Sequence, residues 1–392
     1  MESSAYIPDD ISFSILSKLP LKSFKRFECV RRSWSLLFQT QQFIRTFLFN
    51  SHRFSYYNGS SLLLRDFEFG KNDFYSIFGE RFQNKVKLDF PNPFANHCDF
   101  VILGFGSVNG IICLHEDDYY GKTVLWNPST NTIKLIPPTP NEFIESSISN
   151  SNVEDFVRII DTYYNHGFGY DELINDYKLI CYVCIDVEYA DHGVMSLDSF
   201  WEIYSLRTNS WRILDVDMPY SLSIPYSEGS KVYMDGVCHW LCEVHEDNLH
   251  GPCLVSFYLS NEMFFITPIS SNLDDCFDVQ ALWITLAVLN GCIALISYHE
   301  ESTNFHISIL GEFGVIESWT KLFIVGPLSY VEHPIGVGTK GEIFFVRKDK
   351  EVALFDLCSQ MIEELGHKVM FPQCHRIIIY KESISPIGGI SC

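Results

Sequence analysis

Short apolar runs separated by polar turns dominate this chain from about residue 55 onwards. The runs are rich in Val, Ile, Phe and Tyr and are bounded by Asn, Gly, Asp and Ser. Such segments are typical of β-strands, because branched and aromatic side chains pack well on a pleated sheet. Long amphipathic helical patterns are hard to find here. We therefore predict an all-β domain over residues 55–385, which is too long for a single sandwich.

A weak repeat runs through this domain. Four dipeptides, each at or just before an apolar run, mark it: Asn109-Gly110, Asp235-Gly236, Asn290-Gly291 and Lys340-Gly341. The first and last of these glycines lie 231 residues apart, which leaves room for four intervals of about 58 residues, near the kelch period of about 50. A strand–turn–strand unit cannot bury its own apolar face, so the units must stack. The repeat predicts a kelch-like β-propeller of about six blades.

The first 50 residues have a helical pattern instead. Pro8 followed by Asp9 and Asp10 is a helix start, and Pro20 ends the first helix at Leu19. Three more helices are predicted from their apolar spacing, around Leu21, Phe24 and Phe27, around Val30, Trp34, Leu37 and Phe38, and around Phe43 and Phe47. A unit this small usually needs a disulfide, a metal or a partner. Because residues 1–50 contain one cysteine and no cluster of metal ligands, we expect a partner.

The N-terminal segment resembles the F-box. Four stretches in the family's order carry the resemblance: Ile7–Asp10, Ile15–Pro20, Lys22–Phe24 and Cys29–Trp34. F-boxes bind a Skp-type adaptor, which tethers them to a cullin-based ubiquitin ligase. The resemblance implies that the adaptor-binding residues are Ile7, Pro8, Ile11, Leu16, Leu19, Pro20, Leu21 and Phe24. Which of them touch the adaptor and which pack internally stays open, as does the alternative of an ordinary helical cap.

The β domain resembles the plant F-box-associated domain, often described as kelch-like. The resemblance rests on five stretches, namely Ser107–Leu114, Leu125–Thr130, Gly167–Asp171, Ile203–Trp211 and Asp235–Leu241. Members include many F-box/kelch-repeat proteins and the S-locus F-box proteins of plant self-incompatibility, and nothing in the chain separates these subgroups. Together the two resemblances imply an F-box over residues 1–50 and a substrate-recognition propeller over 55–385.

Charge is unevenly distributed. Residues 1–50 carry seven Lys and Arg against four Asp and Glu, a net charge of +3, so the remainder carries −24 of the total of −21. An acidic surface repels phosphate backbones, which argues against nucleic-acid binding, and it favours a basic protein partner. We predict substrate contacts in two acidic loops, at Glu116, Asp117, Asp118, Glu243, Glu246 and Asp247. The alternative is that these charges only maintain solubility.

Three stretches resemble catalytic or metal motifs, but each fits a strand or turn better. Gly336–Gly341 matches G-x-G-x-x-G, yet a strand rather than a helix is predicted after it. Cys181 and Cys184 have CxxC spacing but lie three apart on a predicted strand, where they point to opposite faces. His239, between Cys238 and Trp240, faces away from both. We therefore predict no cofactor, no metal and no catalytic residues.

The cysteines and the apolar runs indicate where the protein resides. The 13 cysteines form no framework and are expected to be reduced thiols. The N-terminus has no secretory pattern, and no apolar run reaches the roughly 20 residues that span a bilayer. We expect a cytoplasmic or nuclear protein without membrane contact.

Two functions from different classes follow. The first is a non-catalytic substrate-recognition subunit of an SCF-type cullin ubiquitin ligase, in which the F-box docks on a Skp-type adaptor and the β domain selects a protein target. The second is a β-propeller enzyme or small-molecule-binding module with its site in the central channel. A third option is an adaptor-bound protein that acts outside degradation.

Overall fold

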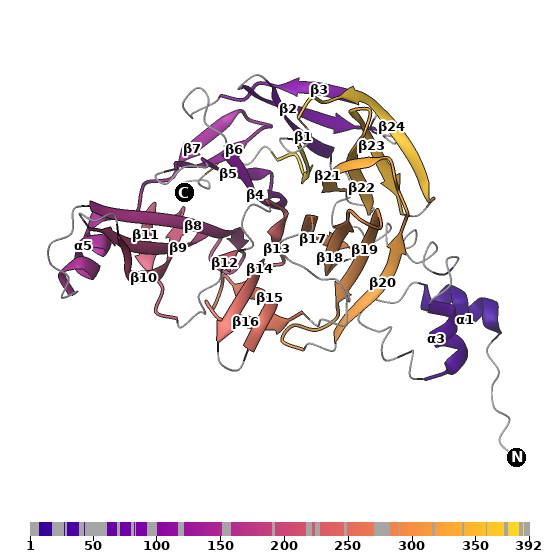
Figure 1. The fold of residues 1–392 in the computed structure, drawn as a ribbon, viewed down its shortest axis with the longest axis horizontal. Helices are drawn as coiled ribbons and strands as arrows, with labels where there is room; N and C mark the ends of the chain where they lie inside the picture. Colours follow the sequence, from indigo (N-terminus) through magenta and orange to yellow (C-terminus); the bar gives the residue numbers. More distant parts are fainter. Residues whose placement is uncertain are drawn as a thin grey trace, which may run out of the picture.

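The structure is a computed structural model of the 392-residue chain. It combines N-terminal helices with a large β domain (Figure 1). The residues that it describes are 8–17, 27, 30–38, 43, 61–68, 71–79, 82, 84–91, 100–116, 121–150, 158–189, 193–216, 222–223, 228–246, 249–269, 283–289, 291–315, 318–338, 341–357, 359–371, 375–383 and 387.

Two helices are described in the N-terminal segment, α1 (Asp9–Leu16) and α3 (Arg32–Phe38). Asp9 and Asp10 occupy the first turn of α1, where carboxylates interact favourably with the helix dipole. These helices lie where the first and third were predicted, although α1 ends at Leu16 rather than at the predicted Leu19. The second and fourth lie outside the described residues, apart from Phe27 and Phe43. No helix in the described part of the chain is long and apolar enough to cross a membrane.

All described strands except the short β12 form six antiparallel groups of four, placed as blades around a common centre (Figure 1). Blade 1 contains β25 (Arg376–Tyr380), β1 (Ser61–Glu68), β2 (Lys71–Phe78) and β3 (Asn84–Leu88). Blade 2 contains β4 (Phe100–Val108), β5 (Ile111–Glu116), β6 (Thr123–Asn127) and β7 (Thr132–Leu135). Blade 3 contains β8 (Arg158–Asp171), β9 (Asp176–Glu188), β10 (Val194–Ser205) and β11 (Ser210–Ile213).

The second half of the ring follows the same plan. Blade 4 contains β13 (Lys231–Met234), β14 (Val237–Glu246), β15 (Leu249–Tyr258) and β16 (Phe264–Pro268), with a short extra strand β12 (Leu222–Ser223) on β14 and the 3-10 turn η3 (Glu228–Ser230) before β13. Blade 5 contains β17 (Trp283–Leu289), β18 (Cys292–His299), β19 (Asn304–Leu310) and β20 (Trp319–Val325). Blade 6 contains β21 (Val331–Val337), β22 (Glu342–Arg347), β23 (Glu351–Asp356) and β24 (Met361–Lys368).

The C-terminal strand β25 closes the ring. It pairs with β1 in antiparallel fashion and makes single parallel bridges to β4 at Gly106 and to β21 at Gly336. A Cβ atom on either glycine would collide with a carbonyl oxygen of β25, so this close approach requires glycine. Blades 6, 1 and 2 thereby join into one continuous sheet.

A buried charge cluster also connects blades 1 and 6. Asp66 on β1 pairs with His375 (2.6 Å) and with His367 on β24 (3.2 Å). Burial acts to raise the pKa of Asp66, but the hydrogen bonds and charges of the two histidines outweigh it and hold that pKa well below its usual range. The closing junction of the ring is therefore electrostatic as well as hydrogen-bonded.

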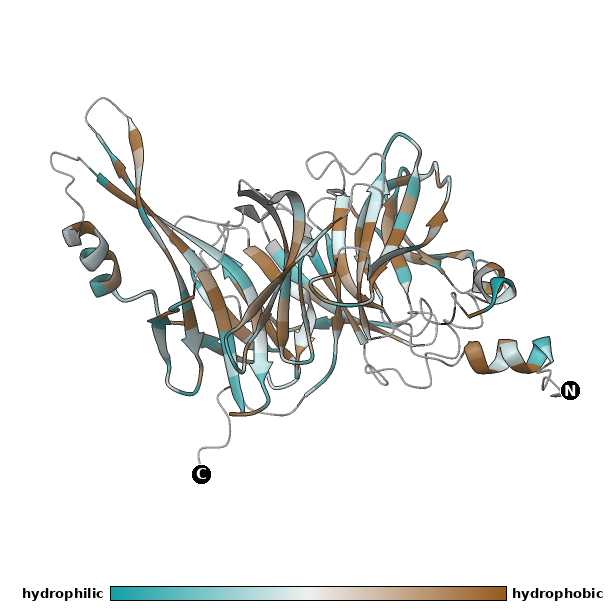
Figure 2. Cartoon of the chain, turned by 90° about the horizontal axis from the view of Figure 1, so that it is seen from below, coloured by the Kyte–Doolittle hydropathy of each residue, from teal (hydrophilic) through white to brown (hydrophobic). Residues whose placement is uncertain are grey.

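The apolar core lies mainly between neighbouring blades. Phe74 of blade 1 contacts Trp126 of blade 2 with ring centroids 4.8 Å apart, and Trp201 of blade 3 lies 5.8 Å from Trp240 of blade 4. Apolar residues follow the strands, and hydrophilic ones gather at the strand ends (Figure 2). Each blade thus buries its faces against its neighbours, as the repeat predicted.

The predicted turn dipeptides join the first and second strands of blades. Asn109 and Gly110 have φ angles of 50° and 83°, and Asp235 and Gly236 have 49° and 80°, as the tight hairpin turn with two left-handed residues requires. Gly291 and Gly341 also have positive φ, 70° and 81°, and lie directly before β18 and β22. Successive strands run in opposite directions, so these turns and the β8–β9 turn all lie on one face of the ring. We call it the inner-turn face.

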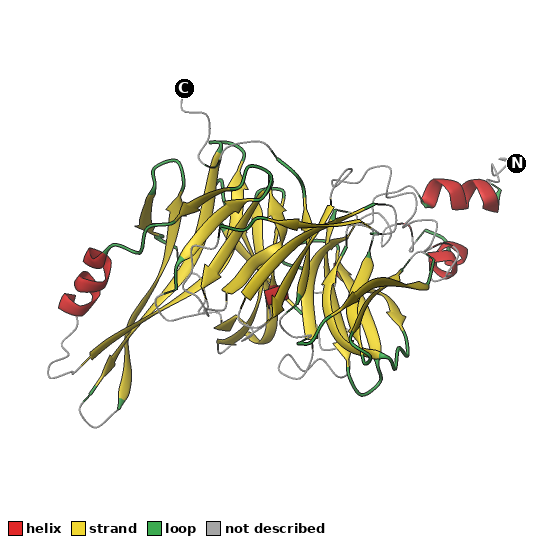
Figure 3. Ribbon diagram, turned by 90° about the horizontal axis from the view of Figure 1, so that it is seen from above, coloured by secondary structure: helices red, strands yellow, loops and turns green. Residues whose placement is uncertain are grey.

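The β domain contains one helix that the sequence did not predict. Helix α5 (Asn141–Asn150) interrupts the β domain between blades 2 and 3 and packs Phe143 against Phe200 of β10. It lies at the opposite end of the molecule from α1 and α3 (Figure 3). Gly336–Gly341 does join two strands, as predicted. Cys181 and Cys184 both lie on β9.

Candidate functional site

The described residues of the predicted adaptor site divide into exposed and buried ones. Ile11 is 47% exposed, and Ile15, one helical turn later on α1, is 52% exposed. Leu16 is only 2% exposed and belongs to the same buried cluster as residues of blades 5 and 6. Pro8 is exposed at the start of the helix. Leu16 therefore packs inside the protein and Ile11 faces outwards, a distinction that the spacing of the apolar residues left open.

Ile15 is not among the residues predicted to contact the adaptor, although its i, i+4 spacing from Ile11 indicates a shared face. The remaining predicted adaptor residues lie outside the described part of the chain: Ile7, Leu19, Pro20, Leu21 and Phe24.

Three of the acidic residues predicted to contact substrate lie in strands and not in the expected loops. Glu116 ends β5, is 7% exposed, and accepts a hydrogen bond from the backbone N–H of Lys122 at 3.2 Å. Glu243 and Glu246 lie within β14 rather than in a loop. Asp117, Asp118 and Asp247 lie outside the described residues. The two loop assignments are corrected at Glu116, Glu243 and Glu246, because pairing of the flanking strands extends further than their acidic composition indicated.

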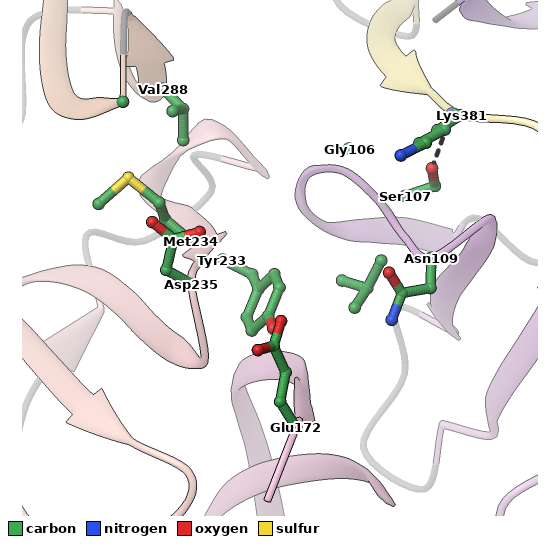
Figure 4. A pocket seen from close by; sticks show the side chains of 11 residues that line it. Gly106, Ser107, Asn109, Glu172, Tyr233, Met234, Asp235, Val288 and Lys381 are labelled. Carbon is green, nitrogen blue, oxygen red and sulfur yellow. Dashed lines mark hydrogen bonds between the residues drawn. The ribbon is translucent and has the colours of Figure 1, made fainter. Parts of the chain in front are cut away.

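A small pocket opens on the inner-turn face where blades 2, 3, 4 and 5 meet. Its polar lining includes Ser107, Asn109, Glu172, Tyr233, Asp235 and Lys381 (Figure 4). Its volume is about 70 Å³, whereas small-molecule sites usually enclose about 300–1,000 Å³. The pocket can take the end of one side chain but not a cofactor.

Tyr233 lines this pocket and connects it to the tyrosines of blade 3. The Tyr233 hydroxyl donates to the carbonyl of Tyr170 (2.8 Å) and accepts from the N–H of Gly236 (3.1 Å). Tyr170 packs against Tyr177 with ring centroids 4.7 Å apart, and burial raises the pKa of Tyr177 to about 12. A Cβ atom on Gly169 would lie 2.5 Å from the Tyr233 ring, so the glycine permits this contact between blades 3 and 4.

The β8–β9 turn beside the pocket presents two apolar side chains to solvent. Leu173 is 79% exposed and Ile174 is 39% exposed. The base of the turn is held by Asp171, whose carboxylate accepts from the N–H of Leu173 (3.0 Å) and pairs with Lys178 (2.9 Å). Lys178 also donates to the carbonyl of Leu259 on the next blade (2.7 Å). Asp171 and Lys178 are 1% and 7% exposed, so a buried ion pair supports an exposed apolar tip.

Two stretches behind the family resemblance hold the C-terminal segment against blade 2. The Asn127 side-chain amide donates to the carbonyl of Ser383 (2.9 Å), and the N–H of Ser383 donates to the Ser129 hydroxyl (3.3 Å). The N–H of Lys381 donates to Ser107 (3.0 Å). This clamp places Lys381 at the pocket. It was not predicted, because its partners lie more than 250 residues apart in the chain.

The buried titratable groups of blades 3 and 4 are closed off from solvent. Glu202 is fully buried and accepts a hydrogen bond from Thr139 (2.5 Å); burial raises its pKa to about 7, and the bond from Thr139 partly opposes that rise. Burial lowers the pKa of His239 to about 3, and its ring pairs with Ser256 (2.9 Å). A catalytic acid or base must reach a substrate proton. Glu202 and His239 are instead buried inside the structure, away from solvent.

Comparisons with known proteins agree with this architecture. Residues 72–382 match the F-box associated beta propeller domain family. An F-box/kelch-repeat protein of Arabidopsis thaliana is 25% identical over 366 residues, covering 90% of this chain and 88% of that protein. The Arabidopsis F-box protein CPR1 is 24% identical over 378 residues, covering 93% and 85%. Among solved structures, a lectin of Aleuria aurantia in complex with Fucalpha1-6GlcNAc is matched over 81% of this chain and 98% of the lectin at 10% identity, with a TM-score of 0.38.

The fold and these matches define a propeller-like protein with an F-box-associated domain. The chain belongs to the F-box-associated β-propeller family, and it is similar to F-box proteins of a plant over most of its length.

Proposed function

We propose that this chain is the substrate-recognition subunit of an SCF-type cullin ubiquitin ligase. In this proposal the N-terminal helices dock on a Skp-type adaptor, which connects to a cullin, and the propeller holds a protein target. The chain performs no bond chemistry itself. It raises the concentration of the target near the ubiquitin-conjugating enzyme, as linked binding modules do.

Family membership carries the proposal, and the surface of α1 supports it. Ile11 and Ile15 are both about half exposed and lie one turn apart. An apolar pair at this spacing gives a short helix a face that a partner can cover. The reducing cytosol or nucleus is the compartment we propose, since seven cysteines of the described part are free thiols.

A pull-down with a plant Skp-type adaptor tests the proposal. We expect the full chain to capture the adaptor, the Ile11→Asp, Ile15→Asp variant to lose capture, and the matched Ser14→Asp variant to keep it, because Ser14 is exposed on the same helix. A Leu19→Ala, Pro20→Ala variant should also lose capture. Circular dichroism checks that the propeller remains folded. Failure of the folded wild-type chain to bind any Skp-type adaptor would overturn the proposal.

A further inference from the structure

The tip of the β8–β9 turn and the pocket beside it form one continuous surface on the inner-turn face. Glu172 belongs to both, since it lines the pocket and immediately precedes Leu173. We define the recognition surface as Glu172, Leu173, Ile174, Tyr233 and Asp235. It is built from blades 3 and 4, whose contact is fixed by the hydrogen bonds of Tyr233 and Lys178.

The apolar side chains of this surface are exposed to solvent at the tip of a turn whose base is rigid. Leu173 has the largest exposed fraction of the large apolar residues in the described part of the chain. A mobile tip could fold its side chains back, but the Asp171–Lys178 pair and the bond from Asp171 to the Leu173 N–H hold the turn in shape. A preorganised apolar projection loses little conformational freedom on binding. This arrangement is typical of an interface anchor rather than of a solvated turn.

The polar part of the surface is acidic. Glu172 and Asp235 are exposed at the pocket, and neither carboxylate has a hydrogen-bond or ion-pair partner within the described part of the chain. Lys381 is the cation of the lining, so the acids exceed it by one. The partly exposed ring of Tyr233 provides a face on which a cation can also rest. A pocket of about 70 Å³ between these groups suits the end of a lysine or arginine side chain.

We propose that this surface binds a protein segment in which a lysine or arginine stands next to a large apolar residue. The basic side chain enters the pocket between Glu172 and Asp235, and the apolar one packs on Leu173 and Ile174. The inference rests on the proposed function in so far as that segment belongs to the ubiquitination target. It names a different site from the acidic residues first expected from the sequence.

An array of 12-residue synthetic peptides, probed with the full chain, tests the proposal. One series places Lys or Arg beside Leu, Ile or Phe; a second replaces the basic residues with Glu; a third replaces the apolar residues with Ser. We expect the first series to bind about tenfold more strongly than the other two, as loss of a central anchor costs about 1–2 kcal/mol. Two double variants should each abolish this preference. One combines Glu172→Gln with Asp235→Asn, and the other combines Leu173→Ser with Ile174→Ser.

Matched controls distinguish this surface from the general negative charge of the chain. Glu300→Gln, Glu301→Gln makes the same charge change at the β18–β19 turn, at the other end of β18 from Gly291. Val194→Ser, Met195→Ser removes two exposed apolar residues at the start of β10, which pair with the end of β9 far from the β8–β9 turn. Both controls should keep the preference. Equal binding of all three series by the wild-type chain, or equal loss in test and control variants, overturns the proposal.

Adaptor capture measured on the same preparations separates the two proposals. Capture retained without peptide preference refutes the recognition surface alone. Peptide preference retained without adaptor capture refutes the ligase role and leaves the surface as part of an independent binding module.

Discussion

The helical segment and the propeller ring differ in how they bury their apolar side chains. In the ring, residues such as Phe74, Trp126 and Trp240 are fully buried between blades. On the helices, Ile11, Ile15 and Leu36 remain 47–60% exposed, and α1 has only eight residues. Short helices gain most of their stability from packing. The ring therefore supports itself, while the helical segment depends on what covers it.

The tip at Leu173 and Ile174 carries the most exposed large apolar side chain in the described part of the ring, Leu173. It exposes apolar side chains as the helices do, yet its base is anchored by the buried pair of Asp171 and Lys178. If the comparison is right, disrupting the ring should lower its stability and leave adaptor capture intact. Removing the exposed tip should change neither the stability of the ring nor adaptor capture.

The largest effect is expected from Lys178→Met. This change leaves the buried Asp171 carboxylate without its cation and removes the bond to the Leu259 carbonyl. Breaking one side of a buried ion pair costs about 3–5 kcal/mol. Chemical denaturation followed by tryptophan fluorescence should show this loss in free energy of unfolding, while adaptor capture by the remaining folded protein is unchanged.

A second variant identifies the cause of that loss. Asp171→Asn, Lys178→Met removes both charges and keeps an acceptor for the Leu173 N–H, so it should recover part of the stability. No recovery would mean that Lys178 acts through packing rather than charge. The exposed Lys87–Asp73 pair is the comparison site, and Lys87→Met should leave the unfolding curve in place.

A smaller, pH-dependent effect is expected at Glu202. Because its pKa in the folded chain is raised to about 7, its contribution to stability is fully present below about pH 4.5 and is lost as pH rises through about 7. The loss is at most about 3 kcal/mol, since each unit of pKa corresponds to about 1.4 kcal/mol. Glu202→Gln should therefore be more stable than wild type at pH 8 and show a flatter stability profile between pH 5 and 8.

The exposed Glu142 on α5 provides the control for Glu202. Glu142→Gln should reproduce the wild-type profile from pH 5 to 8. A profile that stays steep in Glu202→Gln would show that another group carries the dependence.

Much of the ring could be predicted because its signals are local. Asn109-Gly110 and Asp235-Gly236 indicate turns with positive φ. The segments between the turns are rich in residues of high strand propensity, which predicts the strands. Helix α5 was missed because its sequence NEFIESSISN is polar and short. Loops were expected around Glu116 and Glu243 because acidic composition does not reveal where strand pairing stops.

The recognition surface could not be predicted as a unit, since it joins turns about 60 residues apart on neighbouring blades. One local signal was available: an apolar pair, Leu173-Ile174, stands within the otherwise polar turn 171–176. The clamp of Asn127 and Ser129 on Ser383 had no such signal, because only ring closure brings those segments together.

The smallest effect on stability is expected from Leu173→Ser, Ile174→Ser. Neither side chain is buried, and Asp171 can still accept from the backbone of residue 173, so the free energy of unfolding should change by no more than about 0.5 kcal/mol. Tryptophan fluorescence during denaturation measures it, with Val194→Ser, Met195→Ser as the matched pair. A loss above 2 kcal/mol would show that the tip packs within the ring and is not held out for a partner. An unchanged curve, together with a lost peptide preference, would place these two residues with Ile11 and Ile15, as apolar groups whose partner lies outside the chain.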